Sequence, residues 1–270
     1  MPELPEVEVT RRGIEPLIAG RLITQVAIRE PRLRWPVAGA VGALAGRRVR
    51  GVRRRGKYLL LDCDAGTLIV HLGMSGSLRV LPVATPAGKH EHFDLVLGDR
   101  LLRLRDPRRF GAVLWTDAAP ESHPLLAGLG VEPLSREFDA RRLHGLTRGK
   151  RIAIKQLLMD SRRVVGIGNI YASESLFGAR IHPATRASRL SLERCARLVA
   201  AVKQTLRAAI RAGGSSLRDF VRSDGRPGYF QYRYKVYARA GRACPRCGAT
   251  IRRSRQGQRA TYYCPSCQRR

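Results

Sequence analysis

Two close pairs of cysteines near the C-terminus constrain the fold of this chain more than any other feature. Cys244 and Cys247 form one Cys-x-x-Cys pair, Cys264 and Cys267 form the other, and residues 248–263 lie between them. This spacing is typical of a site in which four thiolates bind one Zn²⁺ ion tetrahedrally. Because four thiolates fill the coordination sphere, we expect one structural zinc ion with no open position for catalysis, and a β-hairpin between the pairs.

The other cysteines, Cys63 and Cys195, are isolated in the sequence. This usage suits a reducing compartment with a metal site better than a secreted disulfide framework. The chain has no signal-peptide pattern and no apolar run that approaches the ~18 residues of a membrane span. We therefore expect a cytoplasmic protein without a membrane partner.

The charge of the chain predicts a polyanionic partner. Its 51 Lys and Arg residues against 21 Asp and Glu residues give a net charge of +30 and a pI near 11.4. Hydrophobic residues make up 44% of the sequence, so the chain is expected to fold despite this charge. Nucleic acid is the first expectation and an acidic membrane surface the second. A GC-rich genome would also raise the arginine total, but it does not explain why the first residues are acidic and the remainder basic.

The first six residues place a carboxylate beside a proline at position 2. If Met1 is removed, Pro2 presents a secondary α-amine, whose reference pKa of about 7.7–8.0 leaves far more unprotonated nucleophile at neutral pH than a lysine has. Such an amine can attack a sugar C1′ and form an iminium intermediate, with Glu3 passing protons. The same residues also suit a plain helix start, because proline and acidic side chains favour a first turn.

Hydrophobic spacing divides the chain into regions. A helix is expected from the start to Gly20, followed over 22–116 by short strands that suggest a β-sandwich or a flattened barrel. A linker over 117–149 precedes further helices, which are expected near 152–158, 170–177 and 191–211. The sequence therefore indicates an α+β fold of two domains that ends in a metal-binding hairpin.

Two patterns make sharper predictions inside the strand region. Leu102 and Leu104 alternate with Arg103 and Arg105, which predicts a strand with one buried face. The Gly-Asp dipeptide at 98–99 predicts a tight hairpin turn.

Three apolar or charged residues of the same region lie on turns. Lys57 follows three arginines and a glycine, a position where a lysine is either a solvated charge or reaches a phosphate or an active site. Met74 lies between glycines, and Phe110 follows Arg108 and Arg109 on another turn. Each of these two apolar side chains belongs either to the core or to a wedge between stacked bases.

A glycine turn at 166–169 precedes the helix expected at 170–177. It lacks the third glycine of a dinucleotide fingerprint, and no strand precedes it. Backbone amides and Asn169 that meet a nucleic-acid phosphate fit this turn better, because helix N-termini attract phosphate.

Taken together, these segments resemble the formamidopyrimidine-DNA glycosylase family (Fpg or MutM), over essentially the whole chain. The segments that carry the resemblance are PELPE at 2–6, RRGIEP at 11–16, RLRWP at 32–36, GKYLLL at 56–61, HLGMSGSL at 71–78, DPRRFG at 106–111, GNIYASESLF at 168–177, SDGRPG at 223–228, and the cysteine hairpin, with a looser match near 20–23. The resemblance implies an N-terminal catalytic β-sandwich domain over 1–130, a helical DNA-binding domain with a helix–two-turn–helix over 131–232, and a zinc-finger hairpin over 233–270. Double-stranded DNA would lie in the cleft between the first two.

The resemblance also implies the roles of individual residues. Pro2 would form a Schiff base with deoxyribose and Glu3 would protonate the sugar, while Lys57 would assist β-elimination and Arg259 δ-elimination. The implied phosphate contacts are His71, His90, Arg108, Lys150 and Asn169, and the implied gap-filling trio is Met74, Arg108 and Phe110, with Arg108 facing the orphaned cytosine. Residues 213–228 would form a lid over the extruded base.

The implied activity is that of a bifunctional glycosylase and abasic-site lyase for oxidised purines such as 8-oxoguanine and formamidopyrimidines, working as a bacterial cytoplasmic monomer on the nucleoid. Two alternatives stay open. An endonuclease VIII-type enzyme for oxidised pyrimidines shares Pro2, Glu3 and the zinc hairpin, but Leu4 and the gap-filling trio argue against it. The second alternative is a non-catalytic zinc protein that only binds DNA.

Overall fold

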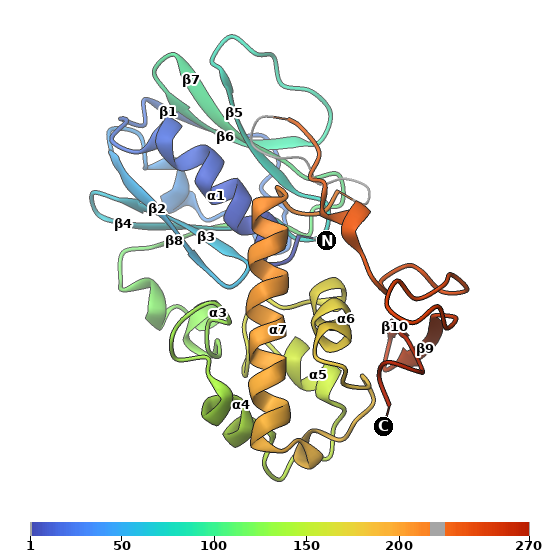
Figure 1. Cartoon of the computed structure of the whole chain (residues 1–270). Coiled ribbons are helices and arrows are strands. Elements are labelled where there is room, and N and C mark those ends of the chain that lie inside the picture. The colour runs from blue at the N-terminus through green and yellow to red at the C-terminus, as the bar shows by residue number, and fades with distance from the viewer. Residues whose placement is uncertain (1, 217–224, 270) are drawn as a thin grey trace. The chain divides into compact units, whose positions relative to one another are not determined.

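The computed structural model describes residues 2–216 and 225–269, and the chain divides into two compact units (Figure 1). Unit 1 consists of Met1–Gly128 and Ala212–Gln231, and unit 2 of Leu129–Arg211 and Tyr232–Arg270. The segment that carries most of the expected lid, 217–224, lies outside the described residues, as does Met1.

Unit 1 begins with helix α1 (Leu4–Ile18), as the sequence predicts. Its N-cap is Glu3, whose backbone N–H donates to the Glu6 carboxylate at 2.8 Å, so the acidic residues satisfy an amide that the helix itself leaves without a partner. Leu4 and Ile14 are fully buried. Gly20, with a φ of +81°, ends the segment in the left-handed region that favours glycine.

Two four-stranded antiparallel sheets follow, and they confirm the predicted sandwich (Figure 1). The strands are β1 (Gln25–Ile28), β2 (Val49–Arg55), β3 (Tyr58–Cys63), β4 (Gly66–His71), β5 (Ser77–Pro82), β6 (Glu91–Leu97), β7 (Arg100–Arg105) and β8 (Ala112–Thr116), with short helices α2 (Gly39–Gly42), η1 (Pro120–Ser122) and α3 (Pro124–Ala127). One sheet has the order β1-β6-β7-β5 and the other β2-β3-β4-β8. One buried apolar cluster includes side chains of both sheets and of α1.

The predicted hairpin at 98–99 is confirmed, because Leu97 pairs with Arg100 across a two-residue turn in which Gly98 has a φ of +75°. The expectation of one buried face for β7 is wrong. Arg103 is only 3% exposed, because Asp94 lies opposite it on β6 and accepts from its Nε at 2.9 Å and from an Nη at 2.8 Å. The face of β7 that the sequence pattern predicts to be exposed is therefore buried at Arg103, where an ion pair with Asp94 compensates the charge.

Unit 2 contains the longer helices of the C-terminal half and the terminal hairpin. Its elements are α4 (Ala140–Thr147), α5 (Ile154–Met159), α6 (Asn169–Gly178), η2 (Ala187–Arg189), α7 (Leu192–Arg211), β9 (Arg252–Gln256) and β10 (Arg259–Tyr263), and η3 (Phe230–Arg233) spans the boundary with unit 1. Ser191 caps α7 by accepting from the Arg194 N–H at 3.2 Å, and Cys195 is fully buried in the apolar stripe of that helix. Both features follow the sequence prediction.

Among the residues that the structure describes, no helix is long and apolar enough to cross a membrane.

The ion pair between β6 and β7 yields a stability prediction. Arg103→Met should lower the free energy of unfolding by about 3 kcal/mol, because it leaves the Asp94 carboxylate buried without its main partner. The double variant Asp94→Leu/Arg103→Met should recover most of that loss, since it removes both buried charges. Urea unfolding of the three proteins measures this, and a cost below about 1 kcal/mol for Arg103→Met would contradict it.

Candidate functional site

The four predicted zinc ligands come together in unit 2. All four Sγ atoms lie within 4.8 Å of one another, with 4.0 Å between Cys244 and Cys267 and 3.5 Å between Cys247 and Cys264. Zinc–sulfur bonds of about 2.3 Å in a tetrahedron require sulfur–sulfur distances of about 3.8 Å, so the cluster fits a Zn²⁺ ion. The backbone N–H of Arg246 donates to the Cys244 sulfur and that of Cys267 to the Cys264 sulfur, each at 3.4 Å.

The zinc hairpin packs on helix α6 through a small apolar cluster. Phe177 of α6 contacts the cluster that contains Ile251 and two of the cysteines, and the Arg246 guanidinium lies 4.8 Å from the centre of the Phe177 ring. Gln268 is fully buried and donates to the Ile181 carbonyl at 2.9 Å. The metal therefore holds the hairpin in one shape, and α6 fixes where the hairpin lies within unit 2.

Arg259 and Asn169 are far apart in the sequence, and the fold of unit 2 brings their segments together. Asn169 begins α6, and its Nδ2 donates at 3.0 Å to the carbonyl of Ala260, 91 positions away and next to Arg259 on β10. Within the described part of the chain, Asn169 Oδ1 is buried without a hydrogen-bond partner, and no hydrogen bond joins the exposed Lys150 to either residue. A cavity of about 260 Å³ adjoins Arg259 and is lined by Lys155, Gln156, Met159, Gln256, Gly257, Gln258 and Arg259.

Pro2 and Glu3 are both buried at the start of α1, and Glu3 is only 2% exposed. The Glu6 carboxylate fixes this start from two sides, because it accepts from the N–H of Glu3 and from the N–H of Ser215, each at 2.8 Å. The start of α1 therefore holds Pro2 and the neighbouring Glu3 carboxylate at a defined place in unit 1.

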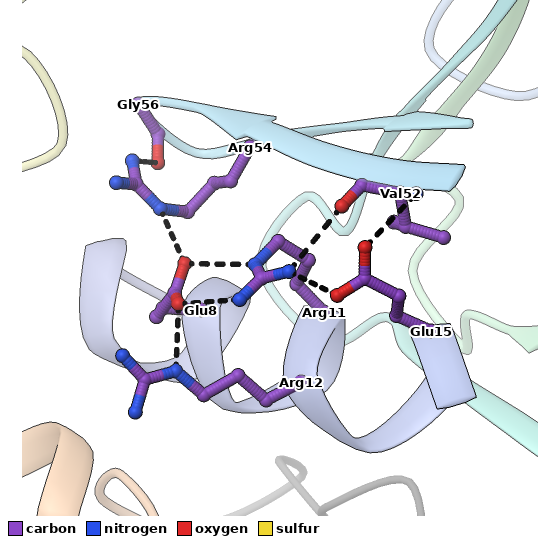
Figure 2. A network of polar contacts seen from close by, with 7 residues as sticks. All are labelled: Glu8, Arg11, Arg12, Glu15, Val52, Arg54 and Gly56. Atoms are coloured by element: carbon purple, nitrogen blue, oxygen red, sulfur yellow. Dashed lines mark hydrogen bonds and ion pairs between the residues drawn. The ribbon is translucent and has the colours of Figure 1, made fainter. Parts of the chain in front are cut away.

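Lys57 lies on the two-residue turn between β2 and β3, where Arg55 pairs with Tyr58. Gly56, the first turn residue, has a φ of +59°, as a type II′ hairpin requires, and Lys57 therefore occupies the second turn position. The Arg54 guanidinium fixes this turn, since it donates to the Gly56 carbonyl at 3.0 Å and to the Glu8 carboxylate of α1 at 3.0 Å (Figure 2).

Glu8 is the centre of the ionic network that links α1 with this hairpin (Figure 2). Arg11, Arg12 and Arg54 all pair with it, and Arg11 also bonds to Glu15 and to the Val52 carbonyl of β2. Burial acts to raise the pKa of Glu8, but hydrogen bonds from Arg11 and Arg12 and the surrounding positive charges lower it to about 2. Glu8 is therefore ionised at neutral pH, and it connects the helix of Pro2 to the turn of Lys57.

His71 ends β4 and is uncharged at neutral pH. Burial, followed by the positive charges of Lys57 and Arg34, lowers its pKa to about 4. Its Nδ1 accepts from the Gly73 N–H at 3.0 Å, so the proton of the neutral ring is on Nε2. The ring stacks at a tilt on Tyr58, with 4.8 Å between the ring centres.

The three residues expected to fill a gap in DNA lie on two adjacent loops of unit 1. Met74 and Phe110 are 38% and 42% exposed, which excludes the alternative that they belong to the core. The Arg108 guanidinium lies 5.0 Å from the centre of the Phe110 ring. The loops touch at Gly73, whose φ is +61° and where a Cβ atom would come within 2.4 Å of the Phe110 backbone. Only glycine allows this approach.

His90 precedes β6 with a φ of +68°, an uncommon conformation for a residue other than glycine. Its pKa is lowered, first by loss of contact with water and then by neighbouring positive charges, of which Lys89 is the largest contributor. The expected lid is described only at 213–216 and 225–228, so the prediction for its centre stays untested.

Sequence reasoning missed several buried polar residues that shape these sites. Lys155 is 1% exposed and donates to the Thr261 hydroxyl at 2.8 Å, next to the zinc hairpin. The Glu174 carboxylate is 5% exposed and accepts from three consecutive backbone N–H groups at 235–237. Their positions in α5 and α6 gave no signal, because these partners lie 61 or more positions away in the sequence.

Three family models match the chain and together cover most of its length. The formamidopyrimidine-DNA glycosylase N-terminal domain matches residues 1–113, the formamidopyrimidine-DNA glycosylase H2TH domain matches 129–221, and the zinc finger found in FPG and IleRS matches 241–270.

Individual relatives are similar over the full length. A formamidopyrimidine-DNA glycosylase of Aromatoleum aromaticum is 62% identical over 271 aligned residues, with 100% of both chains covered. The crystal structure of the MutM (Fpg) protein of Thermus thermophilus has a TM-score of 0.89 at 40% identity, covering 99% of this chain and 98% of that one. A variant of the Lactococcus lactis protein, solved with DNA that contains Fapy-dG, has a TM-score of 0.92 at 33% identity, covering 100% of both chains.

The lowered pKa of His71 yields a pH prediction. The unfolded chain binds a proton at this histidine near pH 6.5 and the folded protein only near pH 4, so stability should fall as the pH drops through this window. The contribution of His71 should reach up to about 3 kcal/mol. Unfolding free energies at pH 4–7 measure it. His71→Asn, whose Oδ1 can accept from the Gly73 N–H, should remove that slope; an unchanged slope would contradict the assignment.

The cysteine cluster yields a metal prediction. Cys264→Ser should reduce bound zinc from one ion per chain to none and should remove the protection of the Gln268 amide against hydrogen exchange, because the metal shapes the hairpin. Cys195→Ser is the matched control, since that thiol is buried in α7 away from the cluster and should leave the zinc in place. Full zinc content in Cys264→Ser would contradict the four-thiolate site.

Proposed function

The chain belongs to the formamidopyrimidine-DNA glycosylase family, and we propose from this premise that Pro2 is the nucleophile of its reaction. The protein is a DNA glycosylase of base excision repair that acts on oxidised purines in DNA, with the abasic-site lyase step that is typical of the family. It binds DNA and holds one structural zinc ion. The observation that carries the proposal for Pro2 is its burial, together with Glu3, at the start of α1 in a chain that aligns with a formamidopyrimidine-DNA glycosylase over 100% of both sequences.

In the proposed mechanism, the Pro2 nitrogen forms a bond to C1′ of the damaged nucleotide while the N-glycosidic bond breaks and the base leaves with a proton. Glu3 protonates the sugar ring oxygen, the ring opens, and an iminium ion joins the protein to the sugar. This chemistry requires the damaged nucleotide to leave the stack, which costs a few kcal/mol. Met1 must be absent, because Pro2 nitrogen in a peptide bond is not a nucleophile.

Strand cleavage follows from the iminium ion, which acidifies the proton on C2′. We propose that Lys57 assists this β-elimination, in which the C2′ proton is removed and the bond to the 3′ oxygen breaks. Its place on a rigid turn tied to α1 through Arg54 and Glu8 supports this role. Arg259 on β10 is the proposed partner for the second step, the δ-elimination. The cavity beside Arg259 supports this role, because it leaves room for the sugar–phosphate backbone of the DNA.

The proposed phosphate contacts are His71, His90, Arg108, Lys150 and Asn169. The neutral His71 ring carries its proton on Nε2, which is suited to donate to a phosphate oxygen. The Asn169 Nδ2 group already donates to Ala260, so only its second proton remains for DNA.

We propose that Met74, Arg108 and Phe110 fill the gap that the extruded nucleotide leaves, with Arg108 facing the orphaned cytosine. The exposure of Met74 and Phe110 on adjacent loops supports this, because apolar side chains inserted into DNA offset part of the cost of unstacking.

The finer assignments are also part of the proposal. The protein acts as a monomer in the bacterial cytoplasm on oxidised purines of the nucleoid, through a catalytic domain at 1–130, a helical domain at 131–232 and a zinc finger at 233–270. The net charge of +30 supports tight binding to DNA that weakens steeply with salt.

Borohydride trapping tests the proposed nucleophile. The zinc-loaded protein with Met1 removed is mixed with a duplex that carries 8-oxoguanine opposite cytosine, in the presence of borohydride, and the adduct is mapped by mass spectrometry. We expect one protein–DNA adduct at Pro2, and a Pro2→Gly variant should excise the base about 100-fold more slowly or worse. An adduct at another side chain, or no adduct, would contradict the mechanism. Faster cleavage of a thymine-glycol duplex would instead indicate an enzyme for oxidised pyrimidines.

A further inference from the structure

Two loops of unit 1 carry the proposed gap-filling residues. Met74 lies on the loop between β4 and β5, and Arg108 and Phe110 lie on the loop between β7 and β8. Each loop crosses from one sheet to the other, because β4 and β8 pair in one sheet and β5 and β7 pair in the other. The paired strands bring the two loops side by side, and contacts between the loops must then fix the spacing of the three side chains if they are to enter DNA together.

Asp106 is the first residue of the β7–β8 loop and is fully buried, and its side chain reaches the β4–β5 loop. Its Oδ1 accepts from the Ser75 hydroxyl at 2.7 Å, beside Met74, and from the Arg108 N–H at 3.3 Å. Its Oδ2 accepts from the Gly111 N–H at 2.7 Å, beside Phe110. One carboxylate thus holds the neighbour of each of the apolar side chains and the backbone of the arginine.

The backbone of Asp106 extends this arrangement to the proposed phosphate contacts. Its N–H donates to the His90 carbonyl at 2.9 Å, and its carbonyl accepts from the Arg109 N–H at 3.2 Å. The carbonyl also lies 2.8 Å from His92 Nε2, which must be the donor because a carbonyl oxygen only accepts. Arg109 has a φ of +55°, a conformation that a residue other than glycine keeps only when its surroundings hold it.

We propose that Asp106 is a positioning residue that fixes Met74 and the Arg108–Phe110 pair at one spacing, so that the three side chains enter the DNA gap as a preformed unit. This inference rests on the proposed function of those side chains. A carboxylate suits the position because all three groups that contact its oxygens are hydrogen-bond donors. The side-chain amide of an asparagine can accept at only one of its two polar atoms. Pre-organisation matters because the cost of ordering the loops is then met before DNA binds.

The experiment separates positioning from folding. The variants are Asp106→Asn, which turns an amide N–H₂ toward a backbone N–H; Ser75→Ala, which releases only the Met74 loop; and the control Asp99→Asn, the same change on the exposed turn between β6 and β7. Each protein is tested on duplexes with 8-oxoguanine opposite cytosine or adenine, and on a single-stranded oligonucleotide with an abasic site. The single strand has no orphaned base and no gap, so it reports the chemistry at Pro2 alone.

Asp106→Asn should excise 8-oxoguanine from duplexes about 10- to 100-fold more slowly and should lose most of the preference for opposite cytosine over adenine. One amide oxygen cannot accept from both the Arg108 and the Gly111 N–H, so the Arg108–Phe110 segment is no longer held in one place. Cleavage of the single strand should stay within about threefold of the wild type. Ser75→Ala should slow duplex excision but keep the preference, since the bonds to Arg108 and Gly111 remain. Asp99→Asn should match the wild type.

Three results for Asp106→Asn would overturn the inference. The first is an equal loss of cleavage rate on the duplex and on the single strand, which indicates a general folding defect. The others are an unchanged preference for cytosine over adenine opposite the lesion, or an unchanged excision rate on duplexes. A wild-type protein that cleaves neither substrate would instead overturn the proposed function. In that case methyl NMR of Met74 tests the position of the loop without an activity assay. The Met74 methyl group should give one sharp resonance in the wild type and a resonance averaged by motion in Asp106→Asn. An identical methyl resonance in both proteins would also overturn the positioning role.

Discussion

The buried carboxylate of Glu8 is the interaction on which the rest of unit 1 depends. It faces three arginines, two from its own helix and one from strand β2, and it stays ionised because their hydrogen bonds and charges outweigh the effect of burial on its pKa. Through Arg54 the same carboxylate reaches the turn that carries Lys57. The helix that begins beside Pro2 and the hairpin that carries Lys57 are therefore joined by an ionic network as well as by apolar packing, since Val7 and Ile14 of α1 share a buried cluster with Val52 of β2.

A metal plays the corresponding part in unit 2. The apolar cluster under the zinc hairpin is small, and it consists mainly of the ligand cysteines, Phe177, Val236 and Ile251. A hairpin with so little buried apolar surface does not hold its shape alone, so four thiolates and one Zn²⁺ ion supply what the core lacks. Lys155 and Asn169 then reach β10 at Thr261 and Ala260, which fixes the arm that carries Arg259.

The register of the paired strands in the sandwich determines where the loops of Met74 and Phe110 lie. Antiparallel pairing brings the ends of β4 and β8 together, and His71 pairs with Ala112 at that edge. The loop after β4 and the loop before β8 come so close that position 73 must be glycine. The Asp106 carboxylate accepts hydrogen bonds from both loops. Met74 and Phe110 on these loops stay exposed to water, and the buried carboxylate beneath them fixes the backbone beside each one.

The sequence by itself determined the features that depend on near neighbours. Cysteine spacing predicts the zinc site, helical periodicity predicts α1 and α7, and Gly98-Asp99 predicts the hairpin between β6 and β7. Each is confirmed because it depends on a spacing within one short segment, which for the two cysteine pairs is the hairpin that joins them. Only the tertiary structure decided which polar residues are buried. Arg103 reads as a solvent-facing strand residue until Asp94 lies opposite it, and Asp106, Lys155 and Glu174 find partners from 31 to 106 positions away. A sequence pattern gives the period of a segment, whereas the burial of a charge depends on what the rest of the chain places against it.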